Sequence, residues 1–160
     1  MKTPEYRLFR IFSILLISCC LLLYCGLPAA MAEEASGACG EQLDWTLYQD
    51  GTLTVSGSGP MMDFTGPSGA PWAGRKSSIT RVVLEPGVTT VGSYAFYACT
   101  GISEAVLPDT LGSVGDYAFT MCASLIGITF PAGMEAIGQS AFYNCRKLTA
   151  LDIPGSIAEI

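Results

Sequence analysis

The sequence predicts a β-rich solenoid in which short parallel strands and short helical turns repeat every 23 residues. The first observation is a phenylalanine that recurs at this interval, as Phe96, Phe119 and Phe142. Cysteines and aliphatic residues keep the same step. A fixed period of about 20 to 50 residues indicates stacked units whose apolar faces cover one another. These further rows are Cys99, Cys122 and Cys145; Ile79, Ile102, Leu125 and Leu148; Leu84, Leu107, Phe130 and Ile153; and Val91, Val114, Ile137 and Ile160.

Residues 1–32 have the three parts of a secretory signal peptide. Basic residues open the segment, an apolar run covers 11–27, and the small-residue sequence Ala-Met-Ala ends at Ala32. Cleavage near Ala32 predicts a secreted or cell-surface protein that meets the membrane only through this segment. The alternatives are an uncleaved anchor, for which the apolar run is short, and a lipid attached at Cys19, beyond which the run continues.

Cleavage would change the charge and the cysteine content of the chain. The full sequence holds 8 Lys+Arg and 14 Asp+Glu, with a formal net charge of −6. Three of the 8 basic residues and one of the 14 acids lie within 1–32, so the mature net charge would be −8. An acidic surface repels phosphate backbones, which argues against a nucleic-acid partner. The cysteines left outside the cell, with three possible disulfide pairings, are Cys39, Cys99, Cys122 and Cys145.

Residues 33–78 are expected to form a leader followed by an N-terminal β-hairpin cap. The stretch 33–40 is small and polar, which favours a flexible leader. Apolar and polar residues then alternate over 43–48 and 52–56, on either side of the turn sequence Asp50-Gly51. Two alternating runs joined by a short Asp-Gly turn are the signal of a β-hairpin.

Leucine-rich units are expected over the remaining residues 79–160. Three are complete, at 79–101, 102–124 and 125–147, and a partial one covers 148–160. Each begins with alternating residues that favour a brief strand, and strands of successive units should pair in parallel about 4.8 Å apart. A proline then ends most of these strands, because proline cannot donate to a sheet ladder.

The second half of each unit contains a glycine followed by the sequence Ala-Phe-x-x-Cys. We expect Gly92, Gly115 and Gly138 to adopt positive φ in a tight turn, which glycine tolerates best. The spacing of Phe and Cys places both on one face of a helical or 3₁₀ turn. The resulting structural ladder comprises Phe96, Phe119, Phe142, Cys99, Cys122 and Cys145.

One unit reads Leu-Pro-Asp-Thr-Leu-Gly-Ser-Val-Gly-Asp-Tyr-Ala-Phe-Thr-Met-Cys over 107–122, and its neighbours are close copies. The front region carries Asp-Gly-Thr-Leu-Thr-Val-Ser-Gly-Ser-Gly over 50–59. Both sequences resemble the BspA-like leucine-rich repeat family of bacterial surface proteins. The resemblance implies a curved, exported solenoid with an N-terminal cap. It also implies adhesion to host matrix proteins or to other bacteria.

The sequence contains no set of residues suited to catalysis, metal binding or cofactor binding. The absence of histidine removes Ser-His and Cys-His nucleophile pairs and histidine metal sites. Cysteines in one column would lie in a line, which favours buried thiols, with a disulfide between neighbouring units as the alternative. Trp45 and Trp72 could stack on a sugar, but packing of the cap on the core is the preferred interpretation. We therefore do not expect an enzyme.

The outward strand positions form the candidate binding face. In solenoids such extended faces commonly bind ligands. Here the face lacks an aromatic anchor, so a merely solvated sheet is the alternative. Tyr97 and Tyr143, next to the buried phenylalanines, are additional contact candidates. The candidate face comprises Arg81, Val83, Glu104, Val106, Gly127, Thr129, Ala150 and Asp152.

We expect a secreted or cell-surface interaction module. Its partner would be a protein, either from the host extracellular matrix or from a bacterial surface. The alternative is a structural spacer, or a fragment of a longer surface protein, with no ligand of its own. The expectation of a fragment rests on Ile160, which falls midway through a unit.

Overall fold

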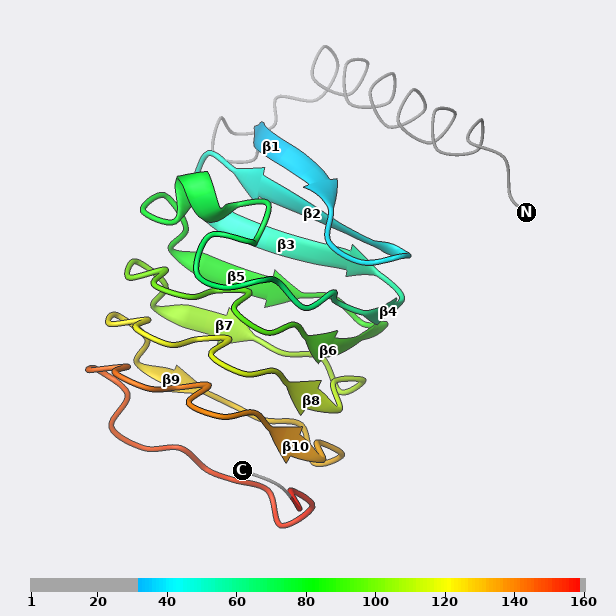
Figure 1. Ribbon diagram of the computed structural model, residues 1–160, viewed down its shortest axis with the longest axis vertical. Coiled ribbons are helices and arrows are strands. Elements are labelled where there is room, and N and C mark those ends of the chain that lie inside the picture. Colours follow the sequence, from blue (N-terminus) through cyan, green and yellow to red (C-terminus); the bar gives the residue numbers. More distant parts are fainter. Residues whose placement is uncertain (1–31, 159–160) are drawn as a thin grey trace. The chain divides into compact units, whose positions relative to one another are not determined.

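Alternating buried and exposed residues build the strands of a stacked solenoid (Figure 1). The computed structural model describes residues 32–158, so Ile160 and nearly all of the expected signal peptide lie outside the described part. A six-stranded sheet, sheet A, has the order β1-β2-β3-β5-β7-β9. Its strands are β1 (Glu33–Ala38), β2 (Leu43–Tyr48), β3 (Thr52–Gly57), β5 (Arg81–Leu84), β7 (Glu104–Val106) and β9 (Gly127–Ile128).

Sheet A changes from antiparallel to parallel pairing at β3. The strands β1, β2 and β3 are antiparallel neighbours, whereas β5, β7 and β9 each pair in parallel with the strand before. Buried Val82 pairs with Ala105, and Ala105 pairs with Ile128, so the inward side chains are aligned across the parallel strands. Since side chains alternate along a strand, the residues between them face outward.

Strand β1 corrects the expectation of a flexible leader at 33–40. Its backbone pairs with β2 from Glu33 opposite Tyr48 to Ala38 opposite Asp44. Small residues allow this pairing, because Gly37 lies directly over the Trp45 indole, where a Cβ would come 3.0 Å from Nε1. The small, polar composition therefore reflects close packing against an aromatic ring.

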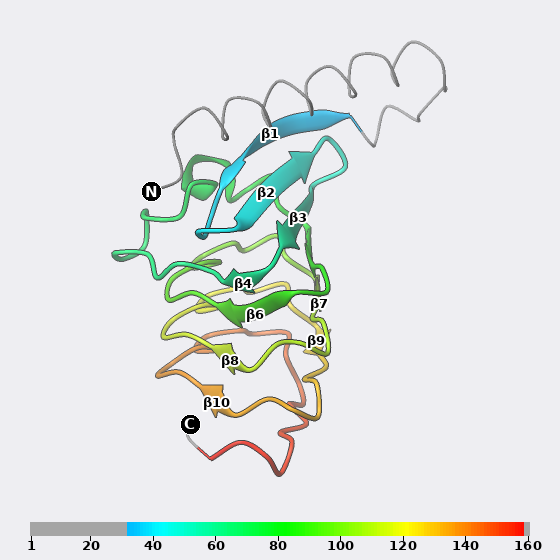
Figure 2. The ribbon, with the colours of Figure 1, turned by 90° about the vertical axis from the view of Figure 1, so that its right-hand side faces the viewer.

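A second sheet, sheet B, was not anticipated from the sequence. It has the order β10-β8-β6-β4, and it faces the viewer in Figure 2. Val91 pairs with Val114, and Val114 with Ile137, and all three are buried. Strands of two to four residues are too short for an alternating pattern to stand out. They are β4 (Gly59–Pro60), β6 (Val88–Val91), β8 (Ser113–Val114) and β10 (Ala136–Ile137).

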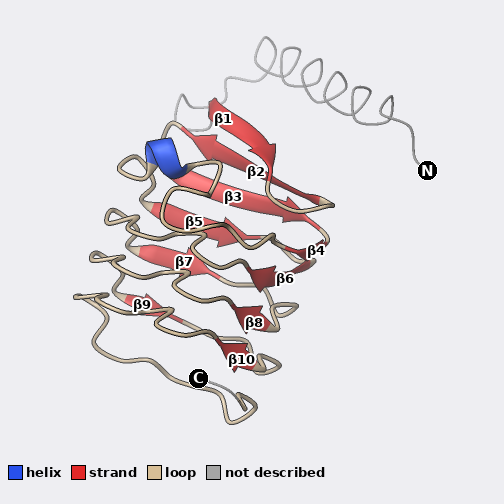
Figure 3. Ribbon diagram, in the orientation of Figure 1, coloured by secondary structure: helices blue, strands red, loops and turns tan. Residues whose placement is uncertain are grey.

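The turn segments after sheet B are not helical, which corrects the expected helical turns. In Figure 3 they are drawn as loops, and the helix assigned in the described residues is the 3₁₀ helix Ala73–Arg75. Positive φ at Tyr94 (58°) and Ala98 (57°) interrupts any right-handed helix. Equivalent residues of the next two coils share this geometry, namely Tyr117, Met121, Ser140 and Asn144.

Hydrogen bonds to the next coil hold these turn segments in place. The amides of Tyr94, Phe96 and Ala98 donate to carbonyls of Asp116, Ala118 and Thr120 at 2.8–2.9 Å. The following coil repeats the pattern one unit later. These turns are therefore satisfied between coils as well as within them, as buried backbone groups require.

Glycine recurs in the turn segments for a different reason from the one expected. The residues with positive φ do not include Gly92, Gly115 or Gly138. Instead, each glycine lies against the backbone of the preceding coil. A Cβ on Gly115 would come 2.6 Å from the Ser93 nitrogen, and one on Gly92 would come 1.9 Å from the Met62 carbonyl oxygen. Close stacking of coils, rather than turn conformation, requires glycine here.

The core is a column of aromatic rings that runs along the stack. Trp72 stacks on Phe96 with centroids 5.4 Å apart, Phe96 on Phe119 at 5.0 Å, and Phe119 on Phe142 at 5.4 Å. The cysteines Cys99, Cys122 and Cys145 are buried beside this column. Each coil thus covers the apolar face of the one before it.

The expected strand at 151–153 is not formed. This segment has no strand assignment, and Ile153 is 45% exposed, whereas the equivalent Phe130 is buried. The earlier member of this row, Leu107, is only partly buried. Within the described residues no strand lies beyond 151–153, so the segment lacks a second neighbour that would hold it in sheet A.

Candidate functional site

Strand pairing brings most of the predicted binding face together on the outside of sheet A. Arg81 pairs with Glu104, Glu104 pairs with Gly127, and Val83 pairs with Val106. Thr129 directly follows β9 and is exposed. Val106 is 37% exposed and Val83 is partly buried, so the face has an apolar centre. The geometry gives a flat surface without a groove at these residues.

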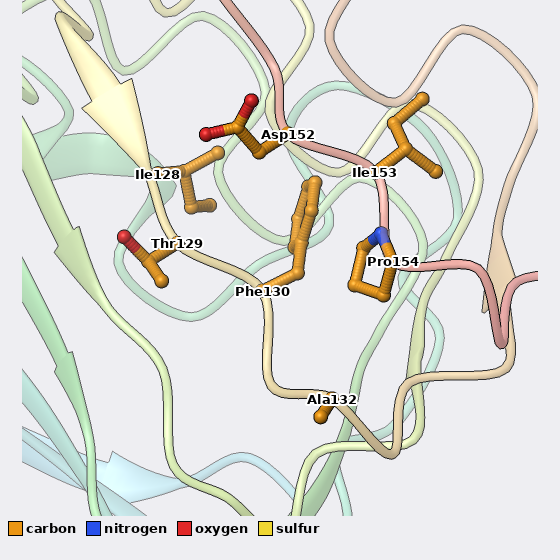
Figure 4. Close-up of a pocket in the computed structure, with 7 residues that line it drawn as sticks. All are labelled: Ile128, Thr129, Phe130, Ala132, Asp152, Ile153 and Pro154. Carbon is orange, nitrogen blue, oxygen red and sulfur yellow. The ribbon is translucent and has the colours of Figure 1, made fainter.

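The last two predicted members, Ala150 and Asp152, are not part of the sheet. Both are exposed and lie in the irregular segment after the third unit. Asp152 instead lines a cavity of about 280 Å³ between this segment and β9 (Figure 4). The other lining residues are Ile128, Thr129, Phe130, Ala132, Ile153 and Pro154. The cavity marks the place where the strand ladder of sheet A is interrupted.

An ion pair crosses the face between neighbouring strands. Arg81 Nε lies 3.0 Å from Glu104 Oε2, and Nη2 donates to Oε1 at 3.4 Å. Both side chains are about half exposed, so the pair contributes at most about 1 kcal/mol to folding. It fixes the two long side chains on the sheet surface, which reduces the entropy that a partner would have to remove.

The hairpin extends the face beyond the residues predicted from the sequence. Thr54 pairs with both Thr46 and Val83, so these outward side chains continue the row of Val83 and Val106. Tyr48 lies at the margin of this surface. Burial raises the pKa of its phenol, and the acids Glu33, Glu85 and Asp50 raise it further. The alternating polar residues of 43–48 and 52–56 were a signal that could have identified this extension.

A second outward cluster consists of tyrosines on the turn segments. The rings of Tyr94 and Tyr117 stack with centroids 4.9 Å apart, and Tyr97 lies 5.8 Å from Tyr94. Tyr143 is 67% exposed. Sequence reasoning selected Tyr97 and Tyr143 but missed Tyr94 and Tyr117, although the 23-residue interval between these two was visible.

The cysteines are buried free thiols in the structure. Cys122 donates its S–H to the Phe96 carbonyl at 3.2 Å, and Cys145 donates to the Phe119 carbonyl at 3.1 Å. Burial raises the pKa of the Cys39 and Cys99 thiols to about 12. Such thiols are poor nucleophiles and poor metal ligands. In residues 32–158 no three His, Cys, Asp or Glu side chains gather as a metal site.

The two tryptophans pack inside the protein. Their rings make an edge contact with centroids 5.6 Å apart, and Trp72 Nε1 donates to the Ala95 carbonyl at 2.7 Å. Trp45 is 4% exposed and Trp72 is fully buried, so neither ring offers a face to a sugar.

The stacked coils and their outer faces define a leucine-rich repeat solenoid. A family model described as "BspA type Leucine rich repeat region (6 copies)" matches residues 74–160. The chain therefore belongs to the BspA-type leucine-rich repeat family. In the described part of the chain, no helix is long and apolar enough to span a membrane.

Solved bacterial leucine-rich repeat proteins share this fold. A leucine-rich repeat protein from Eubacterium ventriosum is 25% identical, with a TM-score of 0.65. The alignment covers 80% of this chain and 40% of that one. The T. pallidum leucine-rich repeat protein is 26% identical, with a TM-score of 0.54, over 76% of this chain and 62% of that one. This chain thus spans less than two thirds of both. A comparison with curated proteins gave no match.

Proposed function

We propose that this chain is an exported interaction module that binds a protein partner through the outer face of sheet A. The family supports a general interaction role, since solenoids of this kind present extended binding surfaces. The single observation that supports the choice of face is its continuous row of outward residues. That row runs over neighbouring strands from Thr46 through Thr54, Val83 and Val106.

The proposal includes a division of the chain. Residues 1–32 act as a signal peptide, the hairpin within 33–78 caps the stack, and units of 23 residues follow from 79 to 160. The unit length is supported by the pairing of Arg81 with Glu104 and of Glu104 with Gly127. The cap is supported by the antiparallel pairing of β2 with β3 before a run of parallel strands.

Adhesion is the form of interaction that we propose. The partner is a host matrix protein or a bacterial surface protein, as the family resemblance implies. A rigid, flat sheet suits such partners because little conformational entropy is lost when it binds. The alternative role as a spacer predicts that no surface substitution on sheet A has any effect on attachment.

The test measures binding of the purified full chain to a panel of immobilised matrix proteins. Val106→Arg places a large charge at the centre of the face, and we expect it to weaken binding at least about tenfold. Ser113→Arg, on the outside of sheet B, is the matched control and should bind normally. Equal binding by both variants would remove sheet A from the proposal, and no binding to any protein of the panel would favour the spacer.

A further inference from the structure

The turn segments carry a surface that goes beyond the proposed protein interface on sheet A. We call it the tyrosine ledge, formed by Tyr94, Tyr97, Tyr117 and Tyr143. Three of its rings form one contact cluster, and the ammonium of Lys76 lies 5.6 Å from the Tyr97 ring centroid. The ledge lies on the turn segments that cross the front of Figure 1, whereas sheet A forms the back of the stack. A ligand could therefore occupy the ledge independently of sheet A.

The backbone of the ledge is unfavourable for tyrosine. Tyr94 and Tyr117 have φ of 58° and 57°, in the left-handed region where bulky side chains are rare. Glycine or asparagine would hold the same conformation with less strain. Ser140, at the equivalent position one coil further on, is small and polar. Folding thus provides no need for two tyrosines here, and strained residues of this kind concentrate at functional sites.

Basic side chains flank the ledge in an otherwise acidic protein. In the described part of the chain, Arg75 and Arg81 form ion pairs with acids. The remaining cations are Lys76, which also donates to the Pro67 carbonyl, and the exposed Arg146 and Lys147 that follow Tyr143.

Two acids also lie in or beside the turn segments. One carboxylate oxygen of Asp63 accepts the Ser93 amide, and one of Asp116 accepts the Gln139 amide, both at 2.7 Å. Each therefore has part of its charge engaged by the backbone. The ends of the ledge remain the places where unpaired cations meet exposed aromatic rings.

We propose that the tyrosine ledge binds an acidic polysaccharide. Sugar rings would pack on the tyrosines, and carboxylates of the polymer would meet the cations at either end. Tyr97 and Tyr143 hold the same position in units two coils apart, so the ledge repeats along the stack. A linear polysaccharide also presents equivalent rings at regular intervals. A folded protein has no such repeat, which favours the polymer as the occupant.

The experiment compares three polymers with the full chain by titration calorimetry at physiological salt. Polygalacturonate carries both sugar rings and carboxylates, its carboxyl-reduced form carries only the rings, and polyglutamate carries only the charge. We expect polygalacturonate to bind at least about tenfold more tightly than either of the others. Equal binding of polyglutamate would overturn the proposal in favour of simple charge attraction, and no binding of polygalacturonate would overturn it outright.

Substitutions then assign the binding to the ledge. Tyr143→Ala and Tyr117→Asn should each weaken polygalacturonate binding about fivefold to tenfold. Tyr143 is largely exposed and Tyr117→Asn relieves backbone strain, so both variants should fold, as a melting curve verifies. Arg146→Gln should weaken binding, whereas Arg81→Gln removes the same charge from sheet A and should have no effect. Unchanged binding in both tyrosine variants would contradict the proposal.

Discussion

At the scale of single residues, the side chains that recur in the sequence are the ones that hold the coils together. Phe119 is fully buried and touches the equivalent ring of both neighbouring coils. Residues that differ between units, such as Arg81 and Glu104, face outward. Repetition therefore reports packing, and specificity has to come from the positions that vary.

Phe119→Ala should lower the free energy of unfolding by about 3–5 kcal/mol, because it removes a ring from the middle of the aromatic column. Urea denaturation followed by circular dichroism measures the change. Tyr143→Ala removes a ring that is 67% exposed and should change stability by less than about 0.5 kcal/mol. Similar losses in the two variants would contradict the description of the core.

Gly115→Ala should destabilise the protein by about 1–3 kcal/mol, because the new Cβ meets the backbone of the preceding coil. Gly133 has no atom within 4 Å of its added Cβ, so Gly133→Ala should be neutral or slightly stabilising. Thermal melting of both variants distinguishes them. A harmless Gly115→Ala would mean that the coils stack less closely than described.

Stability should fall at alkaline pH because buried thiols resist ionisation. Burial raises the pKa of Cys39 and Cys99 from 9.0 to about 12 in the folded protein. The neutral thiols thus favour folding fully below pH 9, and this contribution is lost as the pH rises towards 12. Urea midpoints between pH 8 and 11 should fall less steeply in Cys99→Ala than in the unchanged protein. Identical slopes would show that this thiol is not buried.

The glycines illustrate what a residue pattern can and cannot predict. Their spacing correctly marked a position where no side chain fits. The reason given, positive φ, was wrong because the constraint comes from the neighbouring coil, about 23 residues away. The residues with positive φ are instead Tyr94 and its equivalents, which no local turn rule would select.

At the scale of elements, the strands of sheet A were predictable and those of sheet B were not. Alternation over 43–48 and 52–56 is long enough to recognise, and β2 and β3 occupy those positions. β8 and β10 have two residues each, so their assignment depends on pairing with neighbouring coils. β1 escaped prediction because its outward and inward side chains are nearly all small and exposed.

Gly37→Val should detach β1, because a larger side chain collides with the Trp45 indole. We expect faster amide exchange across Glu33–Ala38 and red-shifted tryptophan fluorescence, with little loss of global stability. Ser36→Val is the control, since Ser36 pairs with Thr46 on the outward side of the sheet. If both variants retain slow exchange in β1, the strand is held by something other than this close contact.

At the scale of the whole molecule, the stack separates its interior from at least two different outer surfaces. Sheet A offers a flat face with an apolar centre, and the turn segments offer aromatic rings flanked by cations. The family and the solenoid could be predicted from the 23-residue period alone. The tyrosine ledge could not be, because it depends on which side chains meet across neighbouring coils.

The central claim is that every coil is joined to the next by backbone hydrogen bonds, even in its turn segment. Amide hydrogen exchange measured by NMR on the full chain tests this most directly. We expect slow exchange to recur at an interval of 23 residues, including Phe96 and Phe119, whose amides donate to Ala118 and Ala141. Rapid exchange across both turn segments, with protection confined to the strands, would contradict the stacked arrangement.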